Sequence, residues 1–218
     1  MTKATARILI VDDERNIRKN LCMVVEAAGY QADAARDGDE ALAKCREQPY
    51  DVAFVDLRMP KMGGLTLLGY IRSLNPNTAV VILTAHGSVT DAVDAMKLGA
   101  VDFLQKPFDP KKIPLLLEEI LLRQRLGPGG SVEDLLHLAQ LARDRSALVE
   151  ARAYVKAAML RDIKRPEPYF WLGLLCEADG DARLAAQYYY MALDTSPTFD
   201  PAREALIRLG HLDSASTA

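Results

Sequence analysis

The sequence predicts an α/β domain built on a five-stranded parallel sheet, followed by a separate all-helical domain. Short apolar runs rich in β-branched residues alternate with segments whose apolar residues recur at helical spacing. This alternation is typical of a buried parallel sheet with helices on both faces. A Gly-Pro-Gly-Gly-Ser linker then ends the alternation, and no strand pattern follows it. The expected organisation is an α/β domain over 1–126, a linker over 127–131, helices over 132–212 and a disordered tail over 213–218.

Each expected strand is followed by an expected helix. The strands lie at about 7–12, 30–35, 52–56, 79–84 and 101–105, and the second, composed of alanines and Asp33, suits a sheet edge. Four of the helices lie at about 15–28, 64–74, 88–98 and 111–125, and another begins at Asp37. Gly29, Asn75-Pro76 and Gly99 are helix-ending signals after the first, third and fourth helices.

Polar residues stand where the strands end. In open α/β sheets, ligands bind at the carboxyl ends of the strands. Three carboxylates gathered there would repel one another, by about 4 kcal/mol per pair at 4 Å near a protein surface, so the site requires cations. Oxygen ligands favour Mg²⁺, and a lysine supplies further positive charge. A single such aspartate could equally cap the next turn, but five matching positions indicate a site: Asp12, Asp13, Asp56, Thr84 and Lys106.

These five strand-end residues, called the rim below, resemble the receiver domain of two-component response regulators in their order and spacing. The matching motifs are Asp12-Asp13, Asp56 in a D-x-R-M-P setting, Thr84-Ala85 and Lys106-Pro107. The resemblance extends from about Arg7 to about Leu126. It implies a doubly wound sheet of strand order 2-1-3-4-5, in which the first and third strands are neighbours.

The resemblance also implies the chemistry of the rim. Asp56 would accept a phosphoryl group from a histidine kinase or a phosphotransfer protein. Asp13 would bind Mg²⁺ directly and Asp12 largely through water, with Asp56 and the backbone carbonyl of Arg58 completing the protein ligands. Lys106 would pair with Asp56 and then with the phosphoryl group. The chain would label itself from small phosphodonors and lose the label again, without acting as an enzyme on other substrates.

Two further residues match the switch of this family. Thr84 would hydrogen-bond a phosphoryl oxygen, and Phe103 would move into the space that Thr84 leaves. Phe103 is equally compatible with an ordinary core residue at a strand end. The Lys106–Pro107 bond matches a position that the family usually holds cis. The last helix of the domain carries more apolar residues than one sheet-facing side requires, which indicates either deep burial or a homodimer surface formed with helix four and strand five.

The region after the linker resembles two tetratricopeptide repeats, at about 132–165 and 166–199, with a capping helix from Pro201 to about Leu209. Small residues recur 34 positions apart, as in Ala151 with Ala185 and Ala158 with Ala192. The first repeat lacks the aromatic, the glycine and the proline of the pattern, so ordinary helical hairpins remain the alternative. If these are repeats, the first helix of each lines a peptide groove through Leu136, Gln140, Arg143, Phe170 and Leu174.

Three functions compete for this chain. The leading one is a phosphorylation-controlled protein that switches a protein-binding module. The second is a transcription regulator with a divergent DNA-binding output, but the net charge of −3 and the absence of a basic stripe after residue 130 disfavour nucleic acid. The third is a hydrolase of the haloacid dehalogenase type, which needs an acid where Arg58 stands.

The sequence also indicates the compartment. Cys22, Cys45 and Cys176 are odd in number and lack metal-ligand spacing, so reduced thiols in the cytoplasm are expected. No stretch approaches the roughly 20 apolar residues of a membrane span, and the four apolar residues before Asp12 are expected to form a strand, since the apolar core of a signal peptide needs about 7 to 15.

Overall fold

The structure is a computed structural model that describes residues 6–85 and 89–212. The chain divides into two compact units, Met1–Leu121 and Leu122–Ala218, each described by itself below. The sequence places this boundary a few residues later, at 126. The predicted tail 213–218 and the predicted helix start at Ser88 lie outside the described residues.

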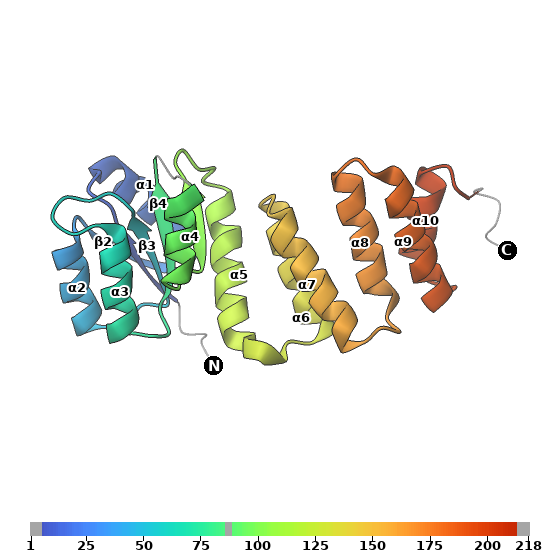
Figure 1. The fold of residues 1–218 in the computed structure, drawn as a ribbon, viewed down its shortest axis with the longest axis horizontal. Coiled ribbons are helices and arrows are strands. Elements are labelled where there is room, and N and C mark those ends of the chain that lie inside the picture. Colours follow the sequence, from blue (N-terminus) through green and yellow to red (C-terminus); the bar gives the residue numbers. More distant parts are fainter. Residues whose placement is uncertain (1–5, 86–88, 213–218) are drawn as a thin grey trace. The chain divides into compact units, whose positions relative to one another are not determined.

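The first unit contains a five-stranded parallel sheet, which confirms the expected fold class (Figure 1). The strand order is β2-β1-β3-β4-β5, as expected. The central strands β3 and β4 are buried along their whole length because helices cover both faces. The strands are β1 Arg7–Val11, β2 Gln31–Ala35, β3 Val52–Asp56, β4 Ala79–Thr84 and β5 Asp102–Gln105.

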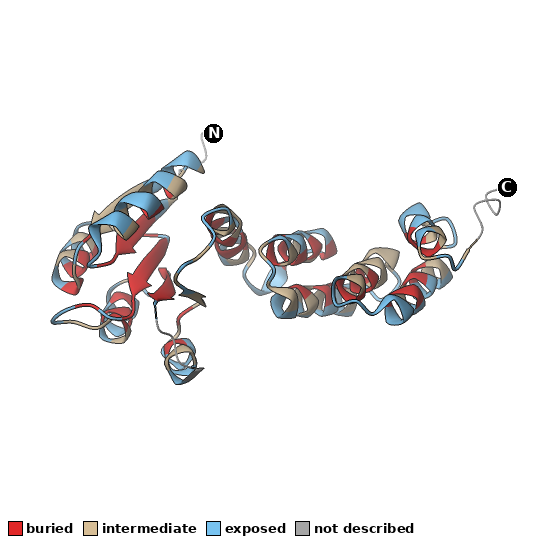
Figure 2. Cartoon of the chain, turned by 90° about the horizontal axis from the view of Figure 1, so that it is seen from above, coloured by how far each residue is buried: buried red, intermediate tan, exposed pale blue. Residues whose placement is uncertain are grey.

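Five helices pack on the two faces of the sheet, and successive strand residues alternate between two apolar clusters. One cluster joins the strands to α1 and α5, and the other joins them to α2, α3 and α4. Figure 2 shows the strands buried and the outer sides of the helices exposed. The helices are α1 Arg15–Ala27, α2 Gly38–Glu47, α3 Gly64–Leu74, α4 Val89–Lys97 and α5 Lys112–Leu126.

The sheet register sets the position of the candidate site. Val11 of β1 pairs with Val55 of β3, so the next residues, Asp12 and Asp56, emerge side by side at the carboxyl ends of neighbouring strands. Thr84 ends β4, and Lys106 follows β5 directly. Four of the five predicted rim residues therefore reach the same edge through backbone geometry alone.

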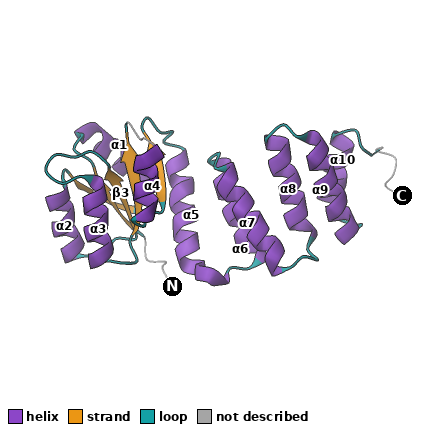
Figure 3. Cartoon of the chain, in the orientation of Figure 1, coloured by secondary structure: helices purple, strands orange, loops and turns teal. Residues whose placement is uncertain are grey.

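The second unit is all-helical in the described residues, as predicted (Figure 3). A short 3-10 helix, Gly127–Gly129, lies within the predicted linker. The α-helices that follow are α6 Val132–Asp144, α7 Leu148–Arg161, α8 Pro166–Ala178, α9 Ala182–Thr195 and α10 Asp200–Arg208. Among the helices that the structure describes, none combines the length and apolarity that crossing a membrane requires.

The turns of the second unit repeat every 34 residues. The turn after α6 has Ser146 at φ 69°, and the turn after α8 has Gly180 at φ 82°, both in the left-handed region. The amide of each donates to the carbonyl three residues earlier, over 2.8 Å in the first turn and 2.9 Å in the second. The next amide in each turn reaches the carbonyl five residues earlier, a paired arrangement that closes a helix end. Helices α6, α8 and α10 also begin 34 residues apart, at Val132, Pro166 and Asp200.

Small side chains allow paired helices of this unit to approach closely. Ala151 and Ala158 of α7, and Ala185 and Ala192 of α9, are fully buried. At Gly173 in α8, an added Cβ would lie 2.2 Å from Cε1 of Tyr189, so only hydrogen fits against that ring. The positions that the sequence marks as small are therefore contact positions within the helical unit.

Candidate functional site

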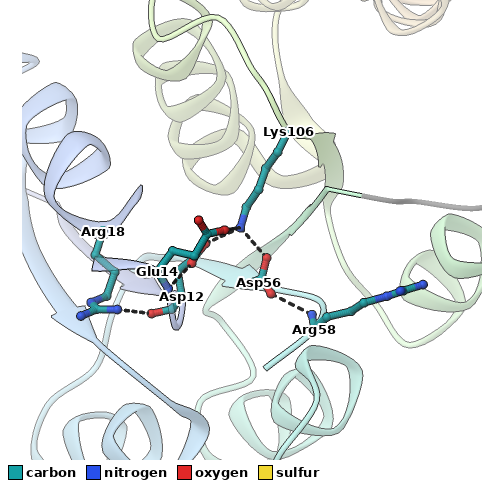
Figure 4. Close-up of polar contacts among 6 residues, drawn as sticks. All are labelled: Asp12, Glu14, Arg18, Asp56, Arg58 and Lys106. Carbon is teal, nitrogen blue, oxygen red and sulfur yellow. Dashed lines mark hydrogen bonds and ion pairs between the residues drawn. The ribbon is translucent and has the colours of Figure 1, made fainter. Parts of the chain in front are cut away.

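The Lys106 ammonium joins the two buried aspartates at the sheet edge. Its Nζ lies 2.6 Å from Oδ2 of Asp12 and 2.6 Å from Oδ1 of Asp56 (Figure 4). Glu14 adds a third, more distant carboxylate at 3.9 Å from the same nitrogen. Asp12 is fully buried and Asp56 is 5% exposed, so these ion pairs are shielded from water and salt. The rim thus holds a preformed cation position between two carboxylates.

Backbone groups hold the other carboxylate oxygens. The Glu14 amide donates to Oδ1 of Asp12 over 2.9 Å, and the Arg58 amide donates to Oδ2 of Asp56 over 2.8 Å. The Arg58 side chain itself is exposed and points away from Asp56 (Figure 4). Both carboxylates are therefore fixed in rotation, one oxygen towards Lys106 and the other towards the loop that follows the strand.

Burial determines the electrostatics of the pair. Burial raises the pKa of Asp56 and the charge of Asp12 adds to this, while the hydrogen bond and charge of Lys106 oppose it. Burial by itself would lower the pKa of Lys106, but the hydrogen bonds and charges of Asp12 and Asp56 outweigh it and raise that pKa. Lys106 therefore remains a cation beside the desolvated Asp56 carboxylate.

The third predicted carboxylate does not join the pair. Asp13 is exposed, and in the described part of the chain no three acidic, histidine or cysteine side chains gather to hold a metal. The convergence of Asp13 with the two buried carboxylates stays a prediction, whereas Lys106 directly joins Asp12 and Asp56. The donor chemistry nevertheless fits Mg²⁺, since Asp12 and Asp56 already direct oxygens at one cation, and Mg²⁺ usually takes few carboxylates and keeps several waters.

Of the two predicted switch residues, Thr84 ends β4, whereas Phe103 of β5 pairs with Ile82, two residues before that end. Thr84 is buried, and its carbonyl accepts the Lys106 amide over 2.7 Å. Phe103 is half-buried against the apolar cluster shared by α2, α3 and α4. The Lys106–Pro107 peptide bond is cis. The switch role of Thr84 and Phe103 stays a prediction, because it concerns a movement between two conformations.

Arg18 is a component of the site that the sequence reasoning missed. It extends from α1 and donates from Nη1 to the carbonyl oxygen of Asp12 over 2.6 Å (Figure 4). Its position one helical turn after Glu14, whose carbonyl accepts the Arg18 amide, is the sequence signal that could have revealed it.

The predicted groove residues of the helical unit differ in how far they are buried. Gln140 is exposed, and Leu174 is half-buried and belongs to neither apolar cluster of the unit. The Arg143 guanidinium lies over the Trp171 ring at 4.9 Å. Leu136 is only 9% exposed and packs in a core cluster, so its assignment to a groove surface is wrong.

Phe170 is also more enclosed than expected. Its ring centroid lies 5.6 Å from that of Tyr189 and 5.7 Å from that of Phe199. The predicted surface aromatic is therefore a half-buried member of the cluster formed by α8, α9 and α10.

A parallel sheet of this order with a buried Asp–Lys–Asp edge defines a receiver-type phosphorylation domain. The sequence signature of the Response regulator receiver domain matches residues 8–118, and the chain belongs to that family. Over 119 residues it is 41% identical to the transcriptional regulatory protein ZraR of Klebsiella oxytoca, covering 55% of this chain and 27% of ZraR. It is 38% identical over 117 residues to the transcriptional regulatory protein ResD of Bacillus subtilis, covering 54% of this chain and 48% of ResD.

Solved structures show the same relationship. A CheY-like receiver domain protein from Methanospirillum hungatei aligns with a TM-score of 0.55 and 30% identity, covering 56% of this chain and 98% of that one. NtrX from Brucella abortus aligns with a TM-score of 0.54 and 34% identity, covering 56% of this chain and 28% of NtrX. The match to ZraR spans about a quarter of that protein's length.

Proposed function

We propose that this chain is a phosphorylation-controlled interaction protein whose phosphoacceptor is Asp56. A histidine kinase or a phosphotransfer protein would donate the phosphoryl group. The single observation that carries this assignment is the buried Asp56 carboxylate at 2.6 Å from the Lys106 ammonium, at the carboxyl end of a central strand. The site also lies inside the segment that places the chain in the receiver domain family.

In the proposed reaction, an oxygen of Asp56 forms a bond to phosphorus while the bond from phosphorus to the donor's oxygen or nitrogen breaks. The leaving group takes the electron pair of the broken bond. Asp12, Asp13, Asp56 and the Arg58 carbonyl would hold Mg²⁺, which when bound supplies positive charge to the transferring group. Lys106 would neutralise a phosphoryl oxygen from the other side. The chain would act on itself and not as an enzyme on a separate substrate.

The proposed switch follows from the new oxygens at Asp56. Thr84 would turn its hydroxyl towards a phosphoryl oxygen, and Phe103 would then occupy the vacated space. Phe103 already packs against the cluster that includes α4, so its movement would change the surface around α4 and β5. A homodimer through α4, β5 and α5 is one use of that surface, and Val93 and Met96 of α4 are 43% and 51% exposed there.

For the output we propose that the helical unit is a tetratricopeptide-like module that binds a protein segment. Support comes from the 34-residue spacing of helix starts and turn hydrogen bonds. Gln140, Arg143 and Leu174 remain the candidate contact residues, with Phe170 contributing the part of its ring that is not enclosed.

Control of transcription is a second candidate, favoured by the names of the relatives. ZraR and ResD are transcriptional regulatory proteins, but the matched segments cover only 55% and 54% of this chain. In this candidate the helical unit would bind nucleic acid in place of a protein segment. Binding of the phosphorylated chain to DNA fragments would favour it over the leading proposal.

Incubation with Mg²⁺ and acetyl phosphate tests the phosphoacceptor assignment. Intact-protein mass spectrometry should show one added phosphoryl group on the wild type and none on Asp56→Asn. Asp39→Asn, which changes an exposed aspartate in the first turn of α2, serves as the matched control and should label like the wild type. Equal labelling of Asp56→Asn and the wild type would refute the assignment.

A further inference from the structure

Arg18 makes a contact that sheet packing does not require. Its Nη1 donates over 2.6 Å to the carbonyl oxygen of Asp12, just beyond the end of β1. The Asp12 amide donates to the Ala35 carbonyl at 3.2 Å, and both carboxylate oxygens of Asp12 are hydrogen-bonded as described above. Arg18 therefore completes the set of partners around Asp12, and the carbonyl that it holds belongs to the peptide bond joining Asp12 to Asp13.

The orientation of that peptide bond influences the direction in which the Asp13 carboxylate points. The Asp13 carboxylate is exposed and makes no hydrogen bond to any residue that the structure describes. Its direction therefore depends on its own backbone, and a planar peptide gives the backbone only two soft rotations per residue. A charge-assisted hydrogen bond to the preceding carbonyl fixes the peptide plane more firmly than a neutral one would.

The position of Arg18 is unfavourable on two other grounds. The first turn of a helix favours anions, yet α1 has no acidic residue there and carries Arg15 and Arg18 instead. A cation beside a divalent-metal site also repels the metal. The charge of Arg18 would therefore weaken Mg²⁺ binding, whereas its hydrogen bond to the Asp12 carbonyl would support Mg²⁺ binding by fixing the backbone that precedes Asp13.

We propose that Arg18 is a positioning residue that holds the Asp12–Asp13 peptide so that Asp13 can bind Mg²⁺. This inference rests on the proposed function, because it takes Asp13 as a metal ligand. Arg18 touches neither the metal nor the phosphoryl group in this role. It acts through the backbone, as residues behind a metal ligand commonly do.

The direction in which Arg18→Met changes the Mg²⁺ affinity distinguishes a positioning effect of Arg18 from an effect of its charge. If Arg18 acts by its charge, Arg18→Met removes a repulsive cation and Mg²⁺ binds more tightly. If Arg18 acts by position, Arg18→Met releases the peptide and Mg²⁺ binds more weakly, by about ten- to a hundredfold as is typical for groups behind metal ligands. Arg18→Lys keeps the charge and one donor, so its affinity should lie between those of the wild type and Arg18→Met.

The experiment is a Mg²⁺ titration of the full chain by calorimetry at constant ionic strength, with the Asp13 amide followed by NMR in metal-free protein. Arg15→Met is the matched control, since it removes the same charge from an exposed position in the same helical turn. It should change the affinity by less than about threefold because exposed charges are screened. The Asp13 amide resonance should shift in Arg18→Met and stay in place in Arg15→Met.

Two results overturn the inference, and they are distinguishable. Unchanged or tighter Mg²⁺ binding by Arg18→Met, with weaker binding by Asp13→Asn, would remove the role of Arg18 and leave the metal site standing. Unchanged binding by Asp13→Asn would show that Asp13 is not a ligand, which refutes the metal part of the proposed function and this inference with it. If Arg18→Met does not fold, the comparison of Arg18→Lys with Arg15→Met gives the same decision.

Discussion

At the scale of single residues, the site is governed by one cation shared between two acids. Lys106 contacts Asp12 and Asp56 at equal distances of 2.6 Å, so neither buried carboxylate is left uncompensated. Removing one partner of a buried ion pair costs more than the pair contributes, because the remaining charge stays buried. Lys106 thus compensates both buried carboxylates, and these two carboxylates also belong to the proposed Mg²⁺ site.

Lys106→Met should increase the affinity for Mg²⁺ and lower the stability of the metal-free protein. Without the ammonium, Asp12 and Asp56 repel each other, and a repulsion of about 4 kcal/mol at 4 Å is ample for a tenfold gain in metal affinity. Thermal unfolding at increasing Mg²⁺ concentrations measures both effects. Lys111→Met, at an exposed position near the start of α5, is the control. If Mg²⁺ stabilised Lys106→Met no more than the wild type, the expected repulsion between Asp12 and Asp56 would be contradicted.

At the scale of elements, close contact between paired helices depends on residues without bulk. Tyr189 is fully buried, and its ring lies against the bare backbone of Gly173 in α8. Its hydroxyl is hydrogen-bonded to Glu177 of α8, and Arg208 of α10 contacts the same carboxylate at 2.6 Å. The Glu177 carboxylate of α8 therefore contacts both α9 and α10, and the Tyr189 ring cannot move away from α8 without breaking the hydrogen bond to Glu177.

Gly173→Ala should destabilise the helical unit by about 1–3 kcal/mol because of overpacking against Tyr189. The same substitution at Gly69 in α3 has open space and should stabilise by up to about 1 kcal/mol, since alanine is the better helix former. Chemical denaturation followed by circular dichroism compares the two variants. A Gly173→Ala protein as stable as the wild type would show that α8 and α9 can separate to admit a methyl group.

At the scale of the whole molecule, the proposed function has phosphorylation of one unit control binding by the other. Phe170 is a poor probe of the binding surface, because its ring also packs against Tyr189 and Phe199. Phe170→Ala should weaken partner binding and also loosen the helices. Leu174 belongs to neither apolar cluster of the unit, so a change there tests binding with less effect on folding.

Leu174→Glu should reduce partner capture while leaving Asp56 labelling by acetyl phosphate unchanged. The reason is that a charge replaces an apolar contact on a half-buried surface, and Asp56 lies in the other unit. Quantitative mass spectrometry of proteins retained by labelled and unlabelled chain measures capture. Leu184→Glu, at an exposed position on α9, is the matched control. Equal capture by wild type and Leu174→Glu would place the binding surface elsewhere.

The sequence by itself determined the sheet, its helices and the strand-end residues of the site. Apolar periodicity and helix-ending signals are local properties, so the strands ending at Asp56 and Thr84 could be predicted from short stretches of chain. The strand order came from the family resemblance, and the structure confirms it. The helical second unit was predictable for the same reason, since α6 to α10 begin and end at local signals.

Only the tertiary structure decided which side chains meet. Whether Lys106 contacts Asp12, whether Asp13 turns outward and whether Arg18 reaches a carbonyl depend on distances between elements far apart in sequence. Leu136 illustrates the same limit, because its helix is amphipathic and the packing of α7 and α8 around the shared cluster selects the buried side. Periodicity identifies a face of a helix, but the neighbour that covers this face is chosen by the fold as a whole.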